Sequence, residues 1–249
     1  MPYVESITKA GRTIEVERYF TARYGRRGQR REDQVKPSKE EQIRINNRQA
    51  EKKLRRILNA NYSPGDYHVV LSYVKARGDP PRDPDQMKDD IARFLRALRK
   101  EYKAAGIELK YIHVAEVGEK GARHHHLVVN KSSPEVIQRC WQHGRIHVNP
   151  LDDTGQYGQL AAYLIKYSCK TIGTPEAIYG KRWNSSRNLV HPVTVTRVVK
   201  NRDWFRSDVR VPHKYARDYV LDKSSVEIGL CSPEYGGYGY MRFTMVMRC

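Results

Sequence analysis

Three consecutive histidines in the middle of the chain, His124, His125 and His126, have the side chains for metal chemistry. They run directly into the apolar residues 127–129, and this β-branched segment predicts a strand over 124–129. Alternate side chains of a strand share a face, so His124 and His126 point one way and His125 the other. Two imidazoles placed in this way can bind one metal ion. The alternative is a solvated histidine run at a strand edge.

An acidic residue on the preceding predicted strand, 109–117, could complete this ligand set. Residues 118–121 predict a turn, which makes the two strands an antiparallel hairpin. Pairing across that turn places Glu116 opposite residues 124–126. Glu116 joins the face of the two histidines only in the right register, which the sequence leaves open. Glu119, in the turn, is a second candidate ligand.

A predicted helix over 157–172 carries the second group of reactive side chains. At about 100° per residue, two of its tyrosines and both lysines fall within one arc, opposite the apolar side chains. A phenol beside cations or a metal ion is a candidate nucleophile, because positive charge favours the phenolate. The alternative is an ordinary amphipathic helix with Tyr and Lys on its wet side. The polar face comprises Tyr163, Lys166, Tyr167 and Lys170, and the apolar face Ala161, Leu164, Ile165, Ser168 and Ile172.

These motifs, taken in order over residues 67–172, resemble those of the HUH endonucleases. The family pattern is His, a bulky residue and His on a central strand, followed by a helix that carries Tyr-x-x-Lys. The chain has HHHLVV and then AAYLIKYSCK, in which two overlapping Tyr-x-x-Lys motifs begin at Tyr163 and Tyr167. This doubled form is most similar to the two-tyrosine rolling-circle replication initiators (Rep proteins) of bacterial plasmids and single-stranded-DNA phages. The chain departs from the pattern at His125, where the family usually has an apolar residue.

The resemblance implies an α+β fold with a central antiparallel sheet and flanking helices, in the HUH/ferredoxin-like manner. It also implies a metal-dependent endonuclease and strand transferase that nicks single-stranded DNA at a specific site. By resemblance, His124, His126 and Glu116 bind Mn²⁺ or Mg²⁺, and Tyr163 or Tyr167 attacks to form a 5′-phosphotyrosine. The free 3′-hydroxyl would prime rolling-circle replication, and the other tyrosine would terminate it. Lys166 and Lys170 would neutralise phosphate or assist proton transfer.

Three segments are expected along the chain. Residues 1–66 read as a basic N-terminal arm with a basic helix over 38–59, capped by Ser38 and directing Ile43 and Leu54 towards the body. Residues 67–172 form the HUH endonuclease domain. Residues 173–249 form a C-terminal extension that packs on the catalytic domain, with strands over 192–199 and 240–247.

The charge balance favours a nucleic-acid partner. The chain has 46 Lys and Arg residues against 28 Asp and Glu, a net charge of +18, and phosphate neutralisation by such an excess releases counterions. We expect contacts to DNA from an arginine-rich arm and from a second basic segment with a tryptophan. The alternative for the arm is a solubilising tail. The alternative for the second segment is a buried tryptophan beside a polar loop. These candidates are Arg26, Arg27, Arg30 and Arg31 in the arm, and Arg182, Trp183 and Arg187 in the second segment.

The remaining expectations concern partners and location. No window has the roughly 18 apolar residues of a membrane span, and the first residues lack the apolar stretch of a secretory signal, so we expect a soluble protein of the bacterial cytoplasm. The chain has no GxxxxGK[ST] motif, which predicts no nucleotide cofactor and a host helicase and polymerase as partners of the origin complex. Two other functions stay open: a non-catalytic single-stranded nucleic-acid-binding protein, and an HUH transposase with one catalytic tyrosine.

Overall fold

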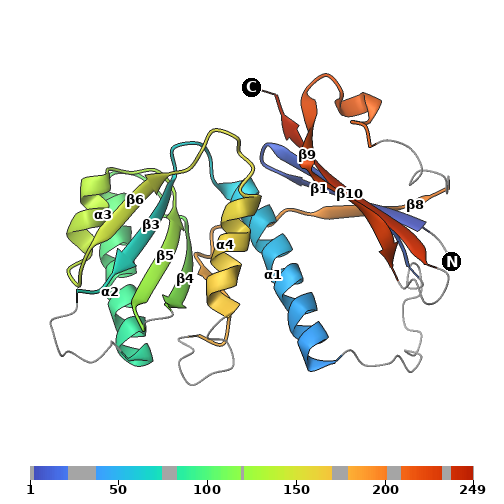
Figure 1. The fold of residues 1–249 in the computed structure, drawn as a ribbon. Helices are drawn as coiled ribbons and strands as arrows, with labels where there is room; N and C mark the ends of the chain where they lie inside the picture. The colour runs from blue at the N-terminus through green and yellow to red at the C-terminus, as the bar shows by residue number, and fades with distance from the viewer. Residues whose placement is uncertain are drawn as a thin grey trace. The chain divides into compact units, whose positions relative to one another are not determined.

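The computed structural model describes residues 3–21, 38–74, 83–118, 121–169, 179–200, 209–231 and 237–248. Within these ranges the chain is α+β, with four α-helices and two five-stranded antiparallel sheets (Figure 1). The predicted fold class, an antiparallel sheet with flanking helices, is confirmed. The chain divides into two compact units, one of residues 1–42 with 191–249 and one of residues 43–190.

The first unit differs from the segments expected from the sequence. Its sheet joins two N-terminal strands to three C-terminal strands, in the order β8-β1-β2-β10-β9. Residues 1–66 are therefore not one arm, because strands within residues 3–20 pair with strands at residues 194–199 and 238–247. The predicted strands 192–199 and 240–247 are present, whereas the other three were not predicted. The strands are β1 (Tyr3–Ala10), β2 (Thr13–Phe20), β8 (Thr194–Val199), β9 (Tyr219–Cys231) and β10 (Tyr238–Met247).

Charged residues inside this sheet explain why β1 and β2 do not read as strands. Glu5 is buried on β1 and forms ion pairs of 2.6 Å with both Arg18 of β2 and Arg197 of β8. These contacts lower the pKa of Glu5 in spite of the opposing effect of burial. In a pattern of alternating apolar and polar residues, a glutamate predicts a side chain that faces solvent. Here the carboxylate is buried instead, because two guanidinium groups compensate its charge inside the sheet.

The second unit is built on a sheet with strand order β6-β3-β5-β4-β7. The histidine strand is its central member and pairs with a strand on each side. The two strands expected over 109–117 and 124–129 are present, with their starts shifted by one or two residues. The strands are β3 (Tyr67–Ser72), β4 (Tyr111–Val117), β5 (Arg123–Val129), β6 (Ile146–Pro150) and β7 (Asn184–Ser185).

Helices cover both faces of this sheet (Figure 1). On one face, α2 (Pro84–Ala104) and α3 (Pro134–Cys140) bury Phe94, Leu98 and Ile137 against Leu71 and Leu127 of the sheet. A capping box at Asp83 begins α2. On the other face lie α1 (Lys39–Asn61) and α4 (Gly158–Cys169).

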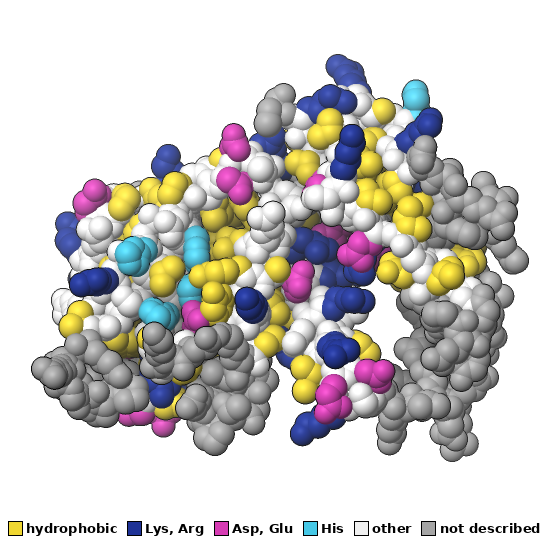
Figure 2. All heavy atoms as spheres, viewed as in Figure 1, with side chains coloured by type: hydrophobic (Ala, Val, Ile, Leu, Met, Phe, Trp, Pro, Cys, Tyr) yellow, Lys and Arg dark blue, Asp and Glu magenta, His cyan; other side chains and the backbone are white. Residues whose placement is uncertain are grey.

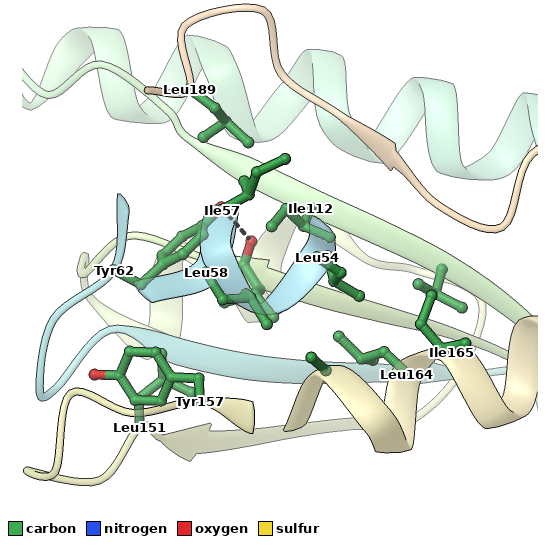
Figure 3. Close-up of a cluster of buried hydrophobic side chains, with 13 residues drawn as sticks. Leu54, Ile57, Leu58, Tyr62, Ile112, Leu151, Tyr157, Leu164, Ile165 and Leu189 are labelled. Carbon is green, nitrogen blue, oxygen red and sulfur yellow. Dashed lines mark hydrogen bonds between the residues drawn. The ribbon is translucent and has the colours of Figure 1, made fainter. Parts of the chain in front are cut away.

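The core beneath α1 and α4 positions the tyrosine helix. Figure 3 shows Leu54 and Leu58 of α1 and Leu164 of α4 packed together over Ile112 of β4. The backbone N–H of Tyr157 donates to the buried side chain of Asn59 at 2.8 Å, which fixes the chain at the start of α4. The apolar side of α4 therefore faces the sheet, as the spacing predicts.

The start of α1 is as predicted, but only part of the helix is buried. Ser38 and Glu41 form reciprocal bonds between side chain and backbone N–H at 3.2 and 2.9 Å. Leu54, Ile57 and Leu58 are buried, whereas Ile43 is 47% exposed. The prediction for Ile43 was wrong because the C-terminal half of the helix provides the residues packed on the sheet. The part of the predicted basic arm directly before the helix, residues 22–37, lies outside the described residues.

Candidate active site

The register of the sheet places the acid and both outer histidines on one face. Glu116 of β4 pairs with His124 of β5, and Val114 pairs with His126. Directly paired residues of an antiparallel sheet point to the same side. The side that carries Glu116, His124 and His126 also carries Val114, which packs in the core under α1 and α4. The register that the sequence left open is thus the one that aligns these three residues.

His126 is held by hydrogen bonds at both ring nitrogens. Its Nε2 lies 2.7 Å from Oε2 of Glu116, and its Nδ1 lies 3.3 Å from Nε2 of His68 on β3. Burial lowers the pKa of His126 to about 4, with a smaller contribution from His124, so the ring is neutral at neutral pH. A carboxylate only accepts, so His126 donates from Nε2 and accepts at Nδ1 from the N–H of His68.

Both tyrosines of α4 contact this imidazole. The ring of Tyr167 stacks on His126 with centroids 5.6 Å apart, and the ring of Tyr163 meets His126 edge-on, also at 5.6 Å. The two tyrosine rings are 4.6 Å apart. Tyr163 is 40% exposed, which leaves it accessible to a substrate. Figure 2 shows histidine side chains gathered at the surface over the strands of this sheet, with an acidic side chain beside them.

The environment of Tyr163 opposes its ionisation. Burial, a hydrogen bond to Tyr167 and the nearby charges of Tyr167 and Glu116 together raise the pKa of Tyr163 to about 12. A phenolate at this position therefore needs added positive charge. Lys166, exposed one turn of helix away, is the cation of the predicted set that the structure describes. Lys170 lies outside the described residues.

His125 points to the opposite face and belongs to a buried hydrogen-bonded chain. Its Nδ1 lies 2.9 Å from Nε2 of His113, and its Nε2 lies 2.9 Å from the hydroxyl of Tyr73. The ring also meets Trp141 edge-on. Burial lowers the pKa of His113 to about 3 and that of His125 well below its usual value. The histidine in place of an apolar residue is thus accommodated as a neutral, hydrogen-bonded core residue.

The donor atoms suit a divalent cation in type, but they now bind one another. Carboxylate and imidazole are ligands that Mn²⁺ accepts, and carboxylate suits Mg²⁺. Among the described residues, no three His, Cys, Asp or Glu side chains form a preformed metal cluster. An ion at this site has to replace the hydrogen bond between Glu116 and His126, with His124 joining from the same face. Glu119, the other acid considered, lies outside the described residues.

The structure separates the candidate DNA-binding residues. The guanidinium of Arg182 donates to Oδ1 of Asn47 at 3.0 and 2.6 Å. Trp183 is half-buried against the core under α1, and the ammonium of Lys53 lies 5.9 Å from its ring centroid. These contacts favour a structural role for Arg182 and Trp183, whereas Arg187 is exposed. The arm residues Arg26, Arg27, Arg30 and Arg31 lie outside the described residues.

The comparison with known families concerns the unit that contains this site. Residues 66–172 match the family model for replication-associated protein ORF2/G2P. The matched segment runs from β3 to the end of α4, so it contains Glu116, His126 and both tyrosines. The match indicates a role in DNA replication. No curated protein and no solved structure matches the chain. None of the helices formed by the described residues has the length and apolar content that a bilayer crossing requires.

One member of the site, His68, was not found by sequence reasoning. Its ring stacks on His126 with centroids 5.5 Å apart and meets Tyr163 edge-on at 5.9 Å. Strand parity puts His68 on the same side as Val70 and Ser72 of β3, but only the pairing of β3 with β5 brings that side to His126. The sequence contains no signal for that long-range pairing.

The buried His113 predicts a loss of stability in acid. Its pKa is about 3 in the folded protein against an ordinary 6.5, so the unfolded chain binds more protons below pH 6.5. The free energy of unfolding should therefore fall by roughly 2 kcal/mol between pH 7 and pH 5 from this residue alone. Urea unfolding at the two pH values measures the change. His113→Leu with His125→Leu removes both partners and should flatten the profile, whereas parallel profiles for variant and wild type would contradict the assignment.

Proposed function

We propose that this chain is a metal-dependent, site-specific nickase and strand transferase for single-stranded DNA that initiates and terminates rolling-circle replication. The observation that carries the proposal is the contact of both α4 tyrosines with His126, which is itself hydrogen-bonded to Glu116. An amphipathic helix with solvated tyrosines does not require this contact. The match of residues 66–172 to a replication-associated family supports the same function.

Cleavage uses one tyrosine hydroxyl as the nucleophile. Its oxygen bonds to the scissile phosphorus, its proton leaves, and the bond from phosphorus to the 3′ oxygen breaks. The products are a 5′-phosphotyrosine and a free 3′-hydroxyl. A bound Mn²⁺ or Mg²⁺, held by His124, His126 and Glu116, would neutralise charge that develops on the phosphate. Tyr163 is the more accessible nucleophile of the pair, and Lys166 beside it supplies positive charge towards the phosphate.

The position of the second tyrosine supports a strand-transfer step. The hydroxyl of Tyr163 is hydrogen-bonded to Tyr167, so an adduct on one phenol leaves the other phenol adjacent to the linkage. Attack by the second tyrosine on the regenerated junction releases a new 3′-hydroxyl. That hydroxyl attacks the first phosphotyrosine, restores the phosphodiester and frees the tyrosine. No cofactor is consumed, because the phosphotyrosine bond conserves the energy of the cut strand. Strand separation and synthesis would come from a host helicase and polymerase.

The nucleophile assignment is tested by removing both phenolic oxygens. Tyr163→Phe with Tyr167→Phe should abolish the covalent adduct with origin-derived single-stranded oligonucleotides in Mn²⁺, read on a denaturing gel. Tyr111→Phe, on the opposite face of the same sheet, is the matched control and should retain the adduct. An adduct that persists in the double variant would refute the assignment. If either single variant completes both nicking and circle closure, the chain uses one tyrosine in the manner of a transposase.

The metal assignment is tested on the two outer histidines. His124→Ala with His126→Ala should remove cleavage in Mn²⁺ and leave single-stranded DNA affinity within a few fold, because these residues serve the reaction and not the bulk of binding. Fluorescence anisotropy and an oligonucleotide cleavage assay measure the two properties. His213→Ala, exposed in the other unit, should cleave normally. If the double variant still nicks DNA in Mn²⁺, the metal ion binds elsewhere. If the wild-type protein binds single-stranded DNA but never cleaves it, the chain is a non-catalytic binding protein.

The arginine-rich arm is proposed to contact the DNA backbone. Replacing Arg26, Arg27, Arg30 and Arg31 with alanine should reduce the slope of log affinity against log salt by up to about 3 for a single strand. Because β1 and β2 precede the arm, substitution is the appropriate test and deletion from the N-terminus is not. The control carries four changes to alanine on the exposed side of α2, at Arg96, Arg99, Lys100 and Lys103. Equal slopes for the two variants would identify the arm as a solubilising segment.

A further inference from the structure

The edge strand β6 carries a row of polar side chains on the face of the candidate active site. Ile146 and Val148 pack towards the core under α2, so the alternating His147 and Asn149 point to the opposite face. Arg145, directly before the strand, continues this alternation. All three polar residues are exposed, and none of their side chains forms a hydrogen bond or ion pair within the described part of the chain. Together they are called the β6 row.

Strand pairing aligns Arg145 with the candidate metal ligands. Its carbonyl accepts the N–H of Ser72 at 2.9 Å, and Ser72 pairs with His124. Gly144 permits this close approach, because a β-carbon there would lie 2.1 Å from the carbonyl oxygen of Ser72. Neighbouring strands lie roughly 5 Å apart, which puts the backbone of Arg145 about 10 Å from that of His124. An anion bound by the guanidinium can therefore lie beside the proposed metal position.

The other two residues of the row adjoin the nucleophile candidates. His147 is in register with His126, with one residue of β3 between them. Asn149 pairs with His68, whose ring meets that of Tyr163 edge-on. The helices α1 and α4 pack on β4 and β5, whereas β6 forms the edge of the sheet beyond β3 (Figure 1). The β6 row thus lies open next to the exposed ring of Tyr163.

The chemistry of the row suits an extended single strand of DNA. Side chains two positions apart on a strand are separated by roughly 7 Å, which is comparable to the separation of successive phosphates in an extended strand. A guanidinium binds phosphate, while an amide and an imidazole can hydrogen-bond to or stack on unpaired bases. Neither β3 nor β6 contains an acidic residue that would repel a phosphate. The alternative is an ordinary solvated edge strand.

We propose that the β6 row binds the nucleotides that flank the scissile phosphate. Arg145 contacts a backbone phosphate, and Asn149 contacts the edge of a base and contributes to the choice of the cleavage site. These residues hold the substrate and take no part in making or breaking bonds. The position of the bound nucleotides relative to the cut rests on the proposed function, whereas binding of the strand to β6 does not.

The phosphate contact is tested by the salt dependence of binding without metal. Arg145→Ala should reduce the slope of log affinity against log salt by about 0.7, the value for one phosphate contact to a single strand. Fluorescence anisotropy with a labelled mixed-sequence single-stranded oligonucleotide in EDTA gives the slope. Arg145→Lys keeps the charge and should keep the wild-type slope. Arg99→Ala, exposed on α2 at the opposite face, is the matched control and should also keep it. Equal slopes for Arg145→Ala and wild type, or an equal reduction in Arg99→Ala, would overturn the proposal.

The base contact is tested by selection from a randomised single-stranded oligonucleotide pool in EDTA. Asn149→Ala should lose the base preference at one position next to the nick and keep the rest of the wild-type motif. Gln138→Ala, exposed on α3 at the opposite face, also removes an amide and should keep the whole motif. An unchanged motif in Asn149→Ala, or a loss far from the nick, contradicts the assignment. The proposed function fails separately, when wild type forms no DNA adduct although Arg145→Ala lowers the salt slope.

Discussion

The antiparallel pairing of β4, β5 and β3 is the constraint on which the candidate site depends. It brings Glu116 and His68, which are far apart in the sequence, to the two ring nitrogens of His126. A slip of one residue would turn His125 into the site and bury His126 among the aromatic residues of the other face. The register is held from both faces, because β5 packs Val128 under α1 and α4 and Leu127 under α2. Packing of the hydrophobic core thus determines which histidine of β5 lies in the candidate site.

Neighbouring histidines of β5 lie on opposite faces of the sheet, in two different environments. His126 meets a carboxylate, a second imidazole and two phenols, whereas His125 completes a chain between His113 and Tyr73. Both rings are neutral and buried, yet only His126 adjoins a carboxylate and an exposed tyrosine. The difference arises from strand parity and not from residue type. A histidine motif is therefore interpreted by the face that each ring occupies.

Local sequence patterns predicted much of the unit of residues 43–190, because its helices and strands show the residue periodicity of their own type of secondary structure. The Tyr and Lys face of α4 follows from helical spacing, and the hairpin around Gly121 follows from turn chemistry. Contacts between distant segments did not follow. His68 joins the site through pairing of β3 with β5, and β1 pairs with β8 across most of the chain. Glu5 breaks the apolar–polar alternation that would predict β1 as a strand. Its ion pairs with Arg18 and Arg197, which allow it to be buried, form only in the assembled sheet.

The closed arrangement of Glu116 and His126 has a consequence for the order of events at the site. The buried carboxylate accepts the Nε2–H of the neutral His126 at 2.7 Å, so it keeps a hydrogen-bond donor when no ion is bound. A divalent cation held by Glu116 and the two histidines would offset the negative charge of Glu116, which opposes ionisation of Tyr163. Under the proposed function, metal binding and activation of the nucleophile would be coupled through Glu116. With its pKa raised to about 12, the phenol of Tyr163 stays protonated at neutral pH, and under the proposed function its ionisation would follow the arrival of a cation and a phosphate substrate.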